Sequence, residues 1–277
     1  MSWKMARFYF SVAVVSLLVV MLLSGRAAAV LVIASDDASD SAYSTGSPVW
    51  ATGDNGGMGF NSWSLSTGGS PAGFFIGDST GLSNPGADIN TSGKSFGMFA
   101  GDNNSSTNEF ADAVRSFSSA LAVGSTFSLD LAVNFRNGNK GFDLRNSGGS
   151  TIFNFNVGGD DYRVNAAATG NGSIGNTYSS NTEFLFSFTQ TSTTGGAWSI
   201  NRSGGVSDFD TGTYSGVAAG FKLYISGTGG GSPNDLFANS FQITAIPEAS
   251  SIFAVGLFGL SSAAIAWLRK RHNAGAP

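Results

Sequence analysis

Acidic and amide side chains recur in glycine-rich stretches of this chain and have the chemistry to bind a metal ion. Calcium takes oxygen ligands from Asp, Asn and backbone carbonyls, usually six to eight of them. The candidate ligands, each beside Asn, Asp or Gly, are Asp54, Asp102, Asp160, Asp161 and Asp235. Their spacing matches no EF-hand loop, and the same residue types are common in ordinary turns. Calcium is therefore a candidate cofactor, with plain turn formation as the alternative.

Two tryptophans complete the set of candidate ligand-binding residues. A flat aromatic ring with a polar edge can stack on the apolar face of a sugar. Trp50 and Trp63 lie in Gly- and Ser-rich sequence without a clear period, which makes exposure more plausible for them than for Trp198 in its alternating run. Burial in the core nevertheless stays the first interpretation of all three. A polysaccharide is therefore a candidate partner.

Residues for covalent or acid–base catalysis are scarce. The chain has no Cys and a single His, His272, which excludes thiol chemistry, a Ser-His-Asp triad and Cys-ligated metal sites. Glycoside hydrolysis needs two carboxyl groups that face one sugar. Residues 30–246 contain only two Glu, Glu109 and Glu183, each isolated in the sequence, so a hydrolase would need an Asp pair. We therefore predict a protein that is not an enzyme, with a glycosidase as the least favoured alternative.

The charge of the central region argues against one class of partner. Residues 30–246 contain 8 Lys and Arg and 17 Asp and Glu, a difference of −9, whereas the whole chain has a net charge of −4. Nucleic-acid binding needs a basic surface that neutralises phosphates. An acidic region of this kind predicts a soluble domain that does not bind nucleic acid.

The elements that must position these side chains are expected to be β-strands. Apolar and polar residues alternate with a period of two in six runs, at 127–135, 153–157, 184–188, 198–200, 221–225 and 241–243. This period is typical of half-buried strands, and the Gly- and Asn-rich clusters between the runs are typical of turns. Residues 110–121 fit both a helix and a strand, and the strand is favoured. The predicted fold of residues 30–245 is all-β, an antiparallel β-sandwich or jelly roll.

The N-terminus has the composition of a signal peptide. Lys4 and Arg7 precede an uncharged apolar run over 8–23, and Ala27 and Ala29 place small residues at the −3 and −1 positions of a cleavage site. Residues 1–29 are therefore predicted to be a leader that signal peptidase removes. An uncleaved N-terminal anchor is the alternative.

The C-terminus contains a second apolar run. Residues 252–268 are apolar enough and just long enough for a transmembrane helix. The basic cluster Arg269, Lys270 and Arg271 follows at once, so the positive-inside rule places it in the cytoplasm and the preceding domain outside. The helix is therefore predicted to hold the domain at a membrane.

The last residues also resemble a known sorting signal. Pro247 and Glu248, the apolar run and the terminal basic cluster occur in the order of the PEP-CTERM signal of Gram-negative bacteria, with Ala249 where a second Pro is usual. The resemblance covers the tail 246–277. It implies export by the general secretory route, transient anchoring in the inner membrane and processing by an exosortase near Pro247 and Glu248. It further implies a destination at the cell surface or outside the cell, with exopolysaccharide and biofilm.

A second resemblance concerns the central domain. Five segments resemble the strand order of concanavalin-like, lectin-like jelly rolls; they are 94–100, 113–117, 124–130, 139–144 and 237–243. The resemblance implies a sandwich of a kind found in carbohydrate-binding proteins, and no binding residue is carried over from it. We predict an exported, non-catalytic structural or interaction protein of the cell surface or matrix. A calcium-dependent, lectin-like module is the alternative.

Overall fold

A computed structural model describes residues 30–44, 49–83, 86–101, 108–166 and 170–246. The predicted leader over 1–29, the tail from Pro247 onward and Asp102 lie outside these ranges. Within them, no helix has the length and hydropathy needed to cross a membrane. Residues Leu31–Ala245 form a compact unit.

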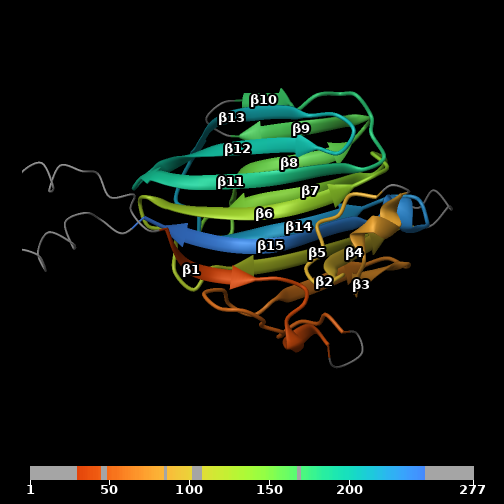
Figure 1. The fold of residues 1–277 in the computed structure, drawn as a ribbon, viewed down its shortest axis with the longest axis horizontal. Helices are drawn as coiled ribbons and strands as arrows, with labels where there is room; N and C mark the ends of the chain where they lie inside the picture. The colour runs from red at the N-terminus through yellow and green to blue at the C-terminus, as the bar shows by residue number, and fades with distance from the viewer. Residues whose placement is uncertain (1–29, 45–48, 84–85, 102–107, 167–169, 247–277) are drawn as a thin grey trace, which may run out of the picture. The chain divides into compact units, whose positions relative to one another are not determined.

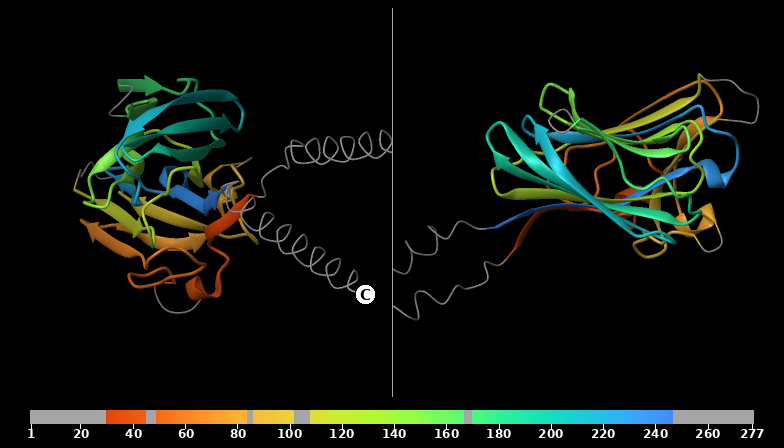
Figure 2. Two further views of the ribbon diagram at one scale, coloured as in Figure 1. Left: turned by 90° about the vertical axis from the view of Figure 1, so that its left-hand side faces the viewer. Right: turned by 90° about the horizontal axis from the view of Figure 1, so that it is seen from above.

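Two antiparallel sheets make up the unit (Figures 1 and 2). The first sheet has the order β13-β12-β11-β6-β15-β4-β3, with β1 also paired to β15. Its strands are β1 (Leu31–Asp36), β3 (Ala72–Gly77), β4 (Ser95–Ala100), β6 (Ser125–Val133), β11 (Thr182–Ser192), β12 (Gly195–Ser203), β13 (Asp208–Ser215) and β15 (Leu236–Ala245). The second sheet has the order β10-β9-β8-β7-β14-β5-β2. Its strands are β2 (Ser64–Gly68), β5 (Phe110–Ser116), β7 (Asn139–Arg145), β8 (Thr151–Gly158), β9 (Asp161–Ala166), β10 (Gly170–Ser173) and β14 (Gly220–Ser226).

The predicted all-β antiparallel sandwich is confirmed, and it is jelly-roll-like. All six runs with a period of two contribute to strands, and β5 confirms the strand expected within 110–121. The segments that resemble concanavalin-like domains lie on β4, β5, β6, β7 and β15.

Aromatic rings fill the space between the sheets. Phe127 on β6 lies with its ring centroid 5.2 Å from that of Phe221 on β14, and the two rings are nearly parallel. Phe142 on β7 contacts Phe188 on β11 in the same way, at 5.4 Å. Each pair joins one sheet to the other. These rings are completely buried, so their burial is a main source of stability.

Strand β15 carries an irregularity at the centre of the first sheet. Along one side it pairs with β6, and the register shifts between Asn239 and Gln242, so that β15 has one extra residue at this point. Ser240 at this bulge has φ of 57°, a left-handed conformation that is uncommon for a residue with a side chain. Bulges of this kind redirect side chains at the surface of a sheet.

The segment between β3 and β4 folds over the outer face of the first sheet. It includes the short 3-10 helix η2 (Ser79–Leu82), and its Leu82, Ala87 and Ile89 pack against Phe237 of β15 in a small separate cluster. The buried Asn239 side chain donates hydrogen bonds to the carbonyl oxygens of Ile89 (2.8 Å) and Lys94 (3.0 Å). This segment therefore forms a wall beside the bulge of β15.

Candidate functional site

A depression of about 290 Å³ lies on the outer face of the first sheet, beside the bulge of β15. We call it the Asp130 depression. Its polar lining includes Ser35, Thr91, Ser128, Asp130, Ser240 and Gln242. Leu185, which is 46% exposed, supplies apolar surface, whereas the Phe241 ring packs in the core between the sheets. Hydroxyl, amide, carboxylate and apolar groups thus meet in one hollow.

Strand register brings these residues together. Ser128 and Asp130 lie on β6, two residues apart and therefore on the same face. Gln242 of β15 lies opposite both Ser128 of β6 and Ser35 of β1. The intervening core residues of β6 are buried, which keeps its polar residues on the outer face.

Asp130 is the central ionisable group of the depression. Burial raises the pKa of its carboxyl group, and a hydrogen bond with the Ser240 side chain acts in the opposite direction. The left-handed backbone of Ser240 is therefore placed directly beside a carboxyl group with a perturbed pKa. Perturbed titratable groups and strained backbone both concentrate at functional sites, which is a reason to regard the depression as a candidate.

Glu183 of β11 is a second carboxyl group on this face. It lies two residues from Leu185, and Leu185 is directly opposite Asp130, so Glu183 and Asp130 are diagonal cross-strand neighbours. The pKa of Glu183 is raised, mainly by burial and secondly by the charge of Asp130, with a smaller contribution from Asp88. The Ser203 hydroxyl lies 3.5 Å from one Glu183 carboxylate oxygen. The pairing of β6 with β11 thus places Asp130 and Glu183 near each other, although they are 53 positions apart in the chain.

The two tryptophans that were candidates for an exposed binding surface are in the core. Trp50 and Trp63 are 0% and 1% exposed, and their ring centroids lie 5.1 Å apart. The Trp63 indole nitrogen donates to the Tyr43 hydroxyl at 3.1 Å. The possible role of Trp50 and Trp63 as exposed stacking residues is therefore wrong, and their burial in the core is confirmed. Trp198 is buried, as expected.

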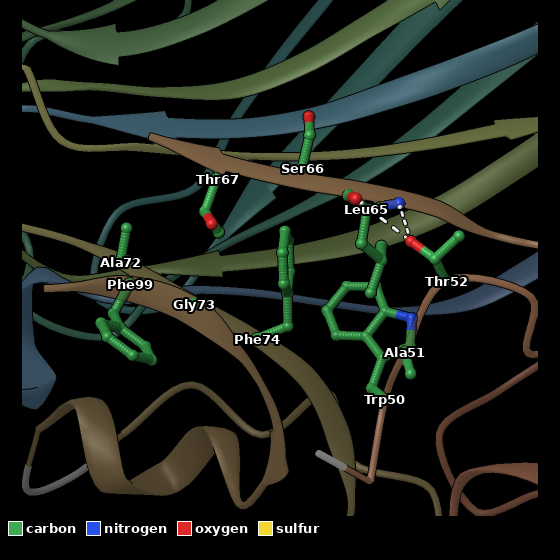
Figure 3. Close-up of a pocket in the computed structure, with 10 residues that line it drawn as sticks. All are labelled: Trp50, Ala51, Thr52, Leu65, Ser66, Thr67, Ala72, Gly73, Phe74 and Phe99. Carbon is green, nitrogen blue, oxygen red and sulfur yellow. Dashed lines mark hydrogen bonds between the residues drawn. The ribbon is translucent and has the colours of Figure 1, made fainter. Parts of the chain in front are cut away.

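Trp50 does line a second hollow, a groove of about 380 Å³ between the edge strands β2 and β3. Figure 3 shows Trp50, Leu65 and Phe74 together at one part of this groove and Phe99 at another. The Thr52 hydroxyl, also shown there, is engaged with Leu65, donating to its carbonyl oxygen at 3.1 Å and accepting from its N–H at 2.9 Å. This groove has fewer polar lining residues than the Asp130 depression.

The candidate calcium ligands among the described residues, Asp54, Asp160, Asp161 and Asp235, belong to no cluster of three metal-ligating side chains. Asp54 accepts the N–H of Ala51 at 2.8 Å, which is turn chemistry. Asp160, with φ of 62°, forms the turn between β8 and β9, and Asp161 accepts from the Ser173 hydroxyl at 2.7 Å and pairs with Arg163 at 3.1 Å. Within the described ranges, no three His, Cys, Asp or Glu side chains lie close enough to hold a metal ion together.

Asp235, a candidate calcium ligand, has the basic side chain of Lys140 as its neighbour. The side chain of Lys140 is completely buried and donates to the carbonyl oxygen of Asn234 at 2.7 Å. Burial raises the pKa of Asp235 to about 7, and the nearby Lys140 charge lowers it in part. A basic side chain, Lys140, therefore already lies near the Asp235 carboxyl group.

Asp130 and Glu183 were missed as a pair because their proximity is not written in any local motif. Asp130 lies in the alternating run 127–135 and Glu183 at the start of the run 184–188, so each looks like an ordinary polar residue on the outer side of a strand. The sequence offered one indication: each carboxylate stands at an outward strand position, and most other outward positions of the same strand are Ser or Thr. The pairing of β6 with β11 decides that they meet.

Comparisons with known proteins identify no family. No protein-family model matches the sequence, and no curated protein is similar to it. Among solved structures, a sialidase has a TM-score of 0.40 and 10% identity over 64% of this chain and 18% of its own. A structure described with endo-acting O-glycanases of the human gut microbiota has a TM-score of 0.42 and 8% identity, over 66% of this chain and 92% of its own. A Caenorhabditis elegans galectin has a TM-score of 0.32 and 15% identity, over 44% of this chain and 83% of its own.

The chain spans less than a fifth of the sialidase.

Proposed function

We propose that this chain is an exported, non-catalytic protein of the cell surface or extracellular matrix that binds a glycan in the Asp130 depression. The observation that carries this proposal is the set of hydrogen-bonding groups beside the β15 bulge. Ser128, Asp130 and Gln242 offer hydroxyl, carboxylate and amide groups, and Leu185 offers exposed apolar surface next to them. A sugar presents hydroxyl groups along its edges and C–H groups on its faces, which is the complementary arrangement.

The charges around the depression favour a neutral glycan. Asp130, Glu183 and Asp88 are acidic, and none of the described residues that line the depression is Lys, Arg or His. An acidic polysaccharide would bring like charges together, and such juxtaposition costs binding free energy. Neutral hydroxyl groups can instead donate to the carboxylates.

The direct test is glycan binding by Asp130→Asn, with Asp160→Asn as the matched control. Both substitutions remove one carboxylate, but Asp160 lies on an exposed turn between β8 and β9 and its left-handed backbone tolerates Asn. Loss of a charge-assisted hydrogen bond should weaken binding about tenfold in Asp130→Asn. Asp160→Asn should bind like the wild type. Equal binding by all three proteins would contradict the proposed site.

The same assay separates the calcium-dependent alternative. Binding that disappears with a chelator and returns with added calcium would support a calcium-dependent lectin. Because no three acidic or His side chains of the described residues lie close enough together to hold a metal ion, we expect binding in the Asp130 depression to be unchanged by chelation.

One observation favours a second function, glycoside hydrolysis. Asp130 and Glu183 are neighbouring carboxyl groups, both with raised pKa values, on one face of a sheet. Two carboxyl groups that flank a sugar are the chemical requirement for hydrolysis. New reducing ends during incubation with a bound glycan, lost in both Asp130→Asn and Glu183→Gln, would establish hydrolysis and overturn the non-catalytic assignment.

A further inference from the structure

Four residues form a row across the first sheet, from the Asp130 depression to the sheet edge. Asp130 of β6 lies opposite Leu185 of β11, Leu185 lies opposite Asn201 of β12, and Asn201 lies opposite Phe209 of β13. Directly opposite residues on neighbouring strands point to the same face. All four side chains are therefore on the outer face, and we call them the Asp130–Phe209 row.

The row ends on an aromatic ring that is freely accessible. Phe209 is 63% exposed, more than any other described aromatic side chain, and Leu185 is 46% exposed. Exposure of single apolar residues is ordinary, but here two of them lie in one line with Asn201 between them. The row thus alternates polar and apolar groups from Asp130 to its end.

A second, polar row runs beside the first. Gln242 of β15, Ser128 of β6, Ser187 of β11, Ser199 of β12 and Thr211 of β13 are successive cross-strand partners. Every one of them bears a hydroxyl or an amide group. The two rows together form a continuous strip of hydrogen-bonding and apolar groups at right angles to the strands.

The strip has the dimensions of an extended saccharide chain. Neighbouring strands are about 4.8 Å apart, so the path from β15 to β13 crosses four intervals and is about 19 Å long. One strand interval is close to the length of one pyranose unit in an extended chain. The strip is therefore much longer than a single sugar or a disaccharide.

The strip also lacks basic side chains. The outward residues of β6, β11, β12 and β13 include Asp130 and Glu183 but no Lys, Arg or His, because Arg202 of β12 points into the sandwich. Its guanidinium donates to the carbonyl oxygens of Gly175 and Thr177, at 2.8 and 2.5 Å. A chain bound along this strip would meet no group that neutralises an anion.

We infer that the ligand of this face is a linear, neutral polysaccharide that lies across the strands, with Phe209 as a stacking platform for a sugar far from Asp130. This inference rests on the proposed function and deepens it. It assigns a binding role to Phe209, which lies outside the Asp130 depression, and it requires that affinity increase with the length of the saccharide.

The test is the affinity of the full chain, in mild detergent, for neutral oligosaccharides from disaccharide to hexasaccharide. The probes are β-linked glucose, mannose and galactose series, with an oligouronate series as the acidic comparison. The wild type should bind each longer member of its preferred neutral series more tightly and should bind the oligouronates weakly. Phe209→Ala should bind the disaccharide normally and the hexasaccharide about three- to tenfold more weakly.

Two further variants make the result specific. Phe209→Trp should restore hexasaccharide binding, because it restores an aromatic platform. Phe110→Ala removes an exposed ring from the opposite sheet and should bind like the wild type. If disaccharide and hexasaccharide bind equally well, or if Phe209→Ala has no effect on either, the inference is wrong and the glycan-binding proposal stands. If the folded wild type binds no neutral saccharide of any length, both are wrong.

Discussion

Arg115 holds the N-terminal part of the sandwich to its second sheet. Its guanidinium is completely buried and pairs with the Asp36 carboxylate. It also donates to the Asn61 carbonyl oxygen at 2.8 Å and to the Asn55 side-chain oxygen at 2.7 Å. The Tyr43 hydroxyl donates to the same Asp36 carboxylate oxygen at 2.5 Å. One side chain of β5 therefore satisfies groups from several points between 36 and 61.

Replacing Arg115 should be severely destabilising. Arg115→Leu would leave Asp36 buried without its cation, and removing one partner of a buried pair costs about 3–5 kcal/mol. Arg163→Leu is the control, because Arg163 pairs with Asp161 while its side chain is 61% exposed, and such pairs contribute about 1 kcal/mol at most. Urea unfolding measures both. Similar losses in the two variants would show that the buried network is not the main support of this region.

Lys140 and Asp235 make the stability dependent on pH. Burial lowers the pKa of Lys140 from 10.5 to about 7 and raises the pKa of Asp235 from 3.8 to about 7. The Asp235 contribution to the unfolding free energy is present below its unfolded pKa and is lost as pH rises towards 7. The Lys140 contribution is present above its unfolded pKa and is lost as pH falls towards 7.

The two effects together predict a minimum near pH 7 in the contribution of this pair. The unfolding free energy of the wild type should be compared with that of the double variant Lys140→Met, Asp235→Asn at acidic, neutral and alkaline pH. The double variant should gain most over the wild type at neutral pH. Its Met and Asn side chains carry no charge, whereas the cost of burying Lys140 and Asp235 is greatest there in the wild type. A difference that is the same at every pH would contradict this account.

At the scale of elements, the bulge of β15 holds Ser240 in a strained backbone conformation and places its hydroxyl beside Asp130. Ser240 adopts φ of 57°, and its side chain bonds to Asp130. Glycine adopts this conformation without a steric penalty, whereas a β-branched residue does not. The strain is therefore a property of the side chain at this position and can be changed separately from the strand.

Substitutions at Ser240 should separate stability from binding. Ser240→Gly should leave the unfolding free energy within about 1 kcal/mol of the wild type, since it loses one hydrogen bond and relieves the left-handed strain. Ser240→Val should cost about 1–3 kcal/mol. Both should weaken glycan binding, because Asp130 loses its hydroxyl partner. Thermal unfolding and the binding assay report the two effects, and undiminished glycan binding by Ser240→Gly would remove Ser240 from the site.

Some elements were predictable from the sequence, and others were not. The alternation of Phe184, Phe186 and Phe188 identifies a strand with one buried face, because side chains of a strand point to opposite faces in turn. Trp50 was harder to assign, because its burial depends on contacts with Trp63 and Phe96, which are distant in sequence and follow no local period. The bulge at Ser240 could not be predicted from the local sequence either, since Ser seldom adopts a left-handed backbone conformation.

At the scale of the whole molecule, the proposed export depends on the two ends of the chain. Both ends lie outside the described residues, so the proposal rests on the sequence. Replacing Pro247 and Glu248 with Ala should leave the C-terminal tail attached and the protein in the inner membrane, because the proposed exosortase would not recognise it. Fractionation and the mass of the mature protein measure this. Normal release of the variant would contradict processing at this position.

The sequence by itself determined the fold class, the acidic character of the central domain and the shortage of residues for covalent catalysis. These depend on local periodicity and on composition, which no folding event changes. Only the tertiary structure decided that Trp50 and Trp63 are buried, that the described calcium candidates form no cluster of three ligands, and that Asp130 lies beside Glu183 and Ser240. The physical reason is that a strand pattern states which residues share a face, whereas the pairing and register of distant strands decide which faces meet.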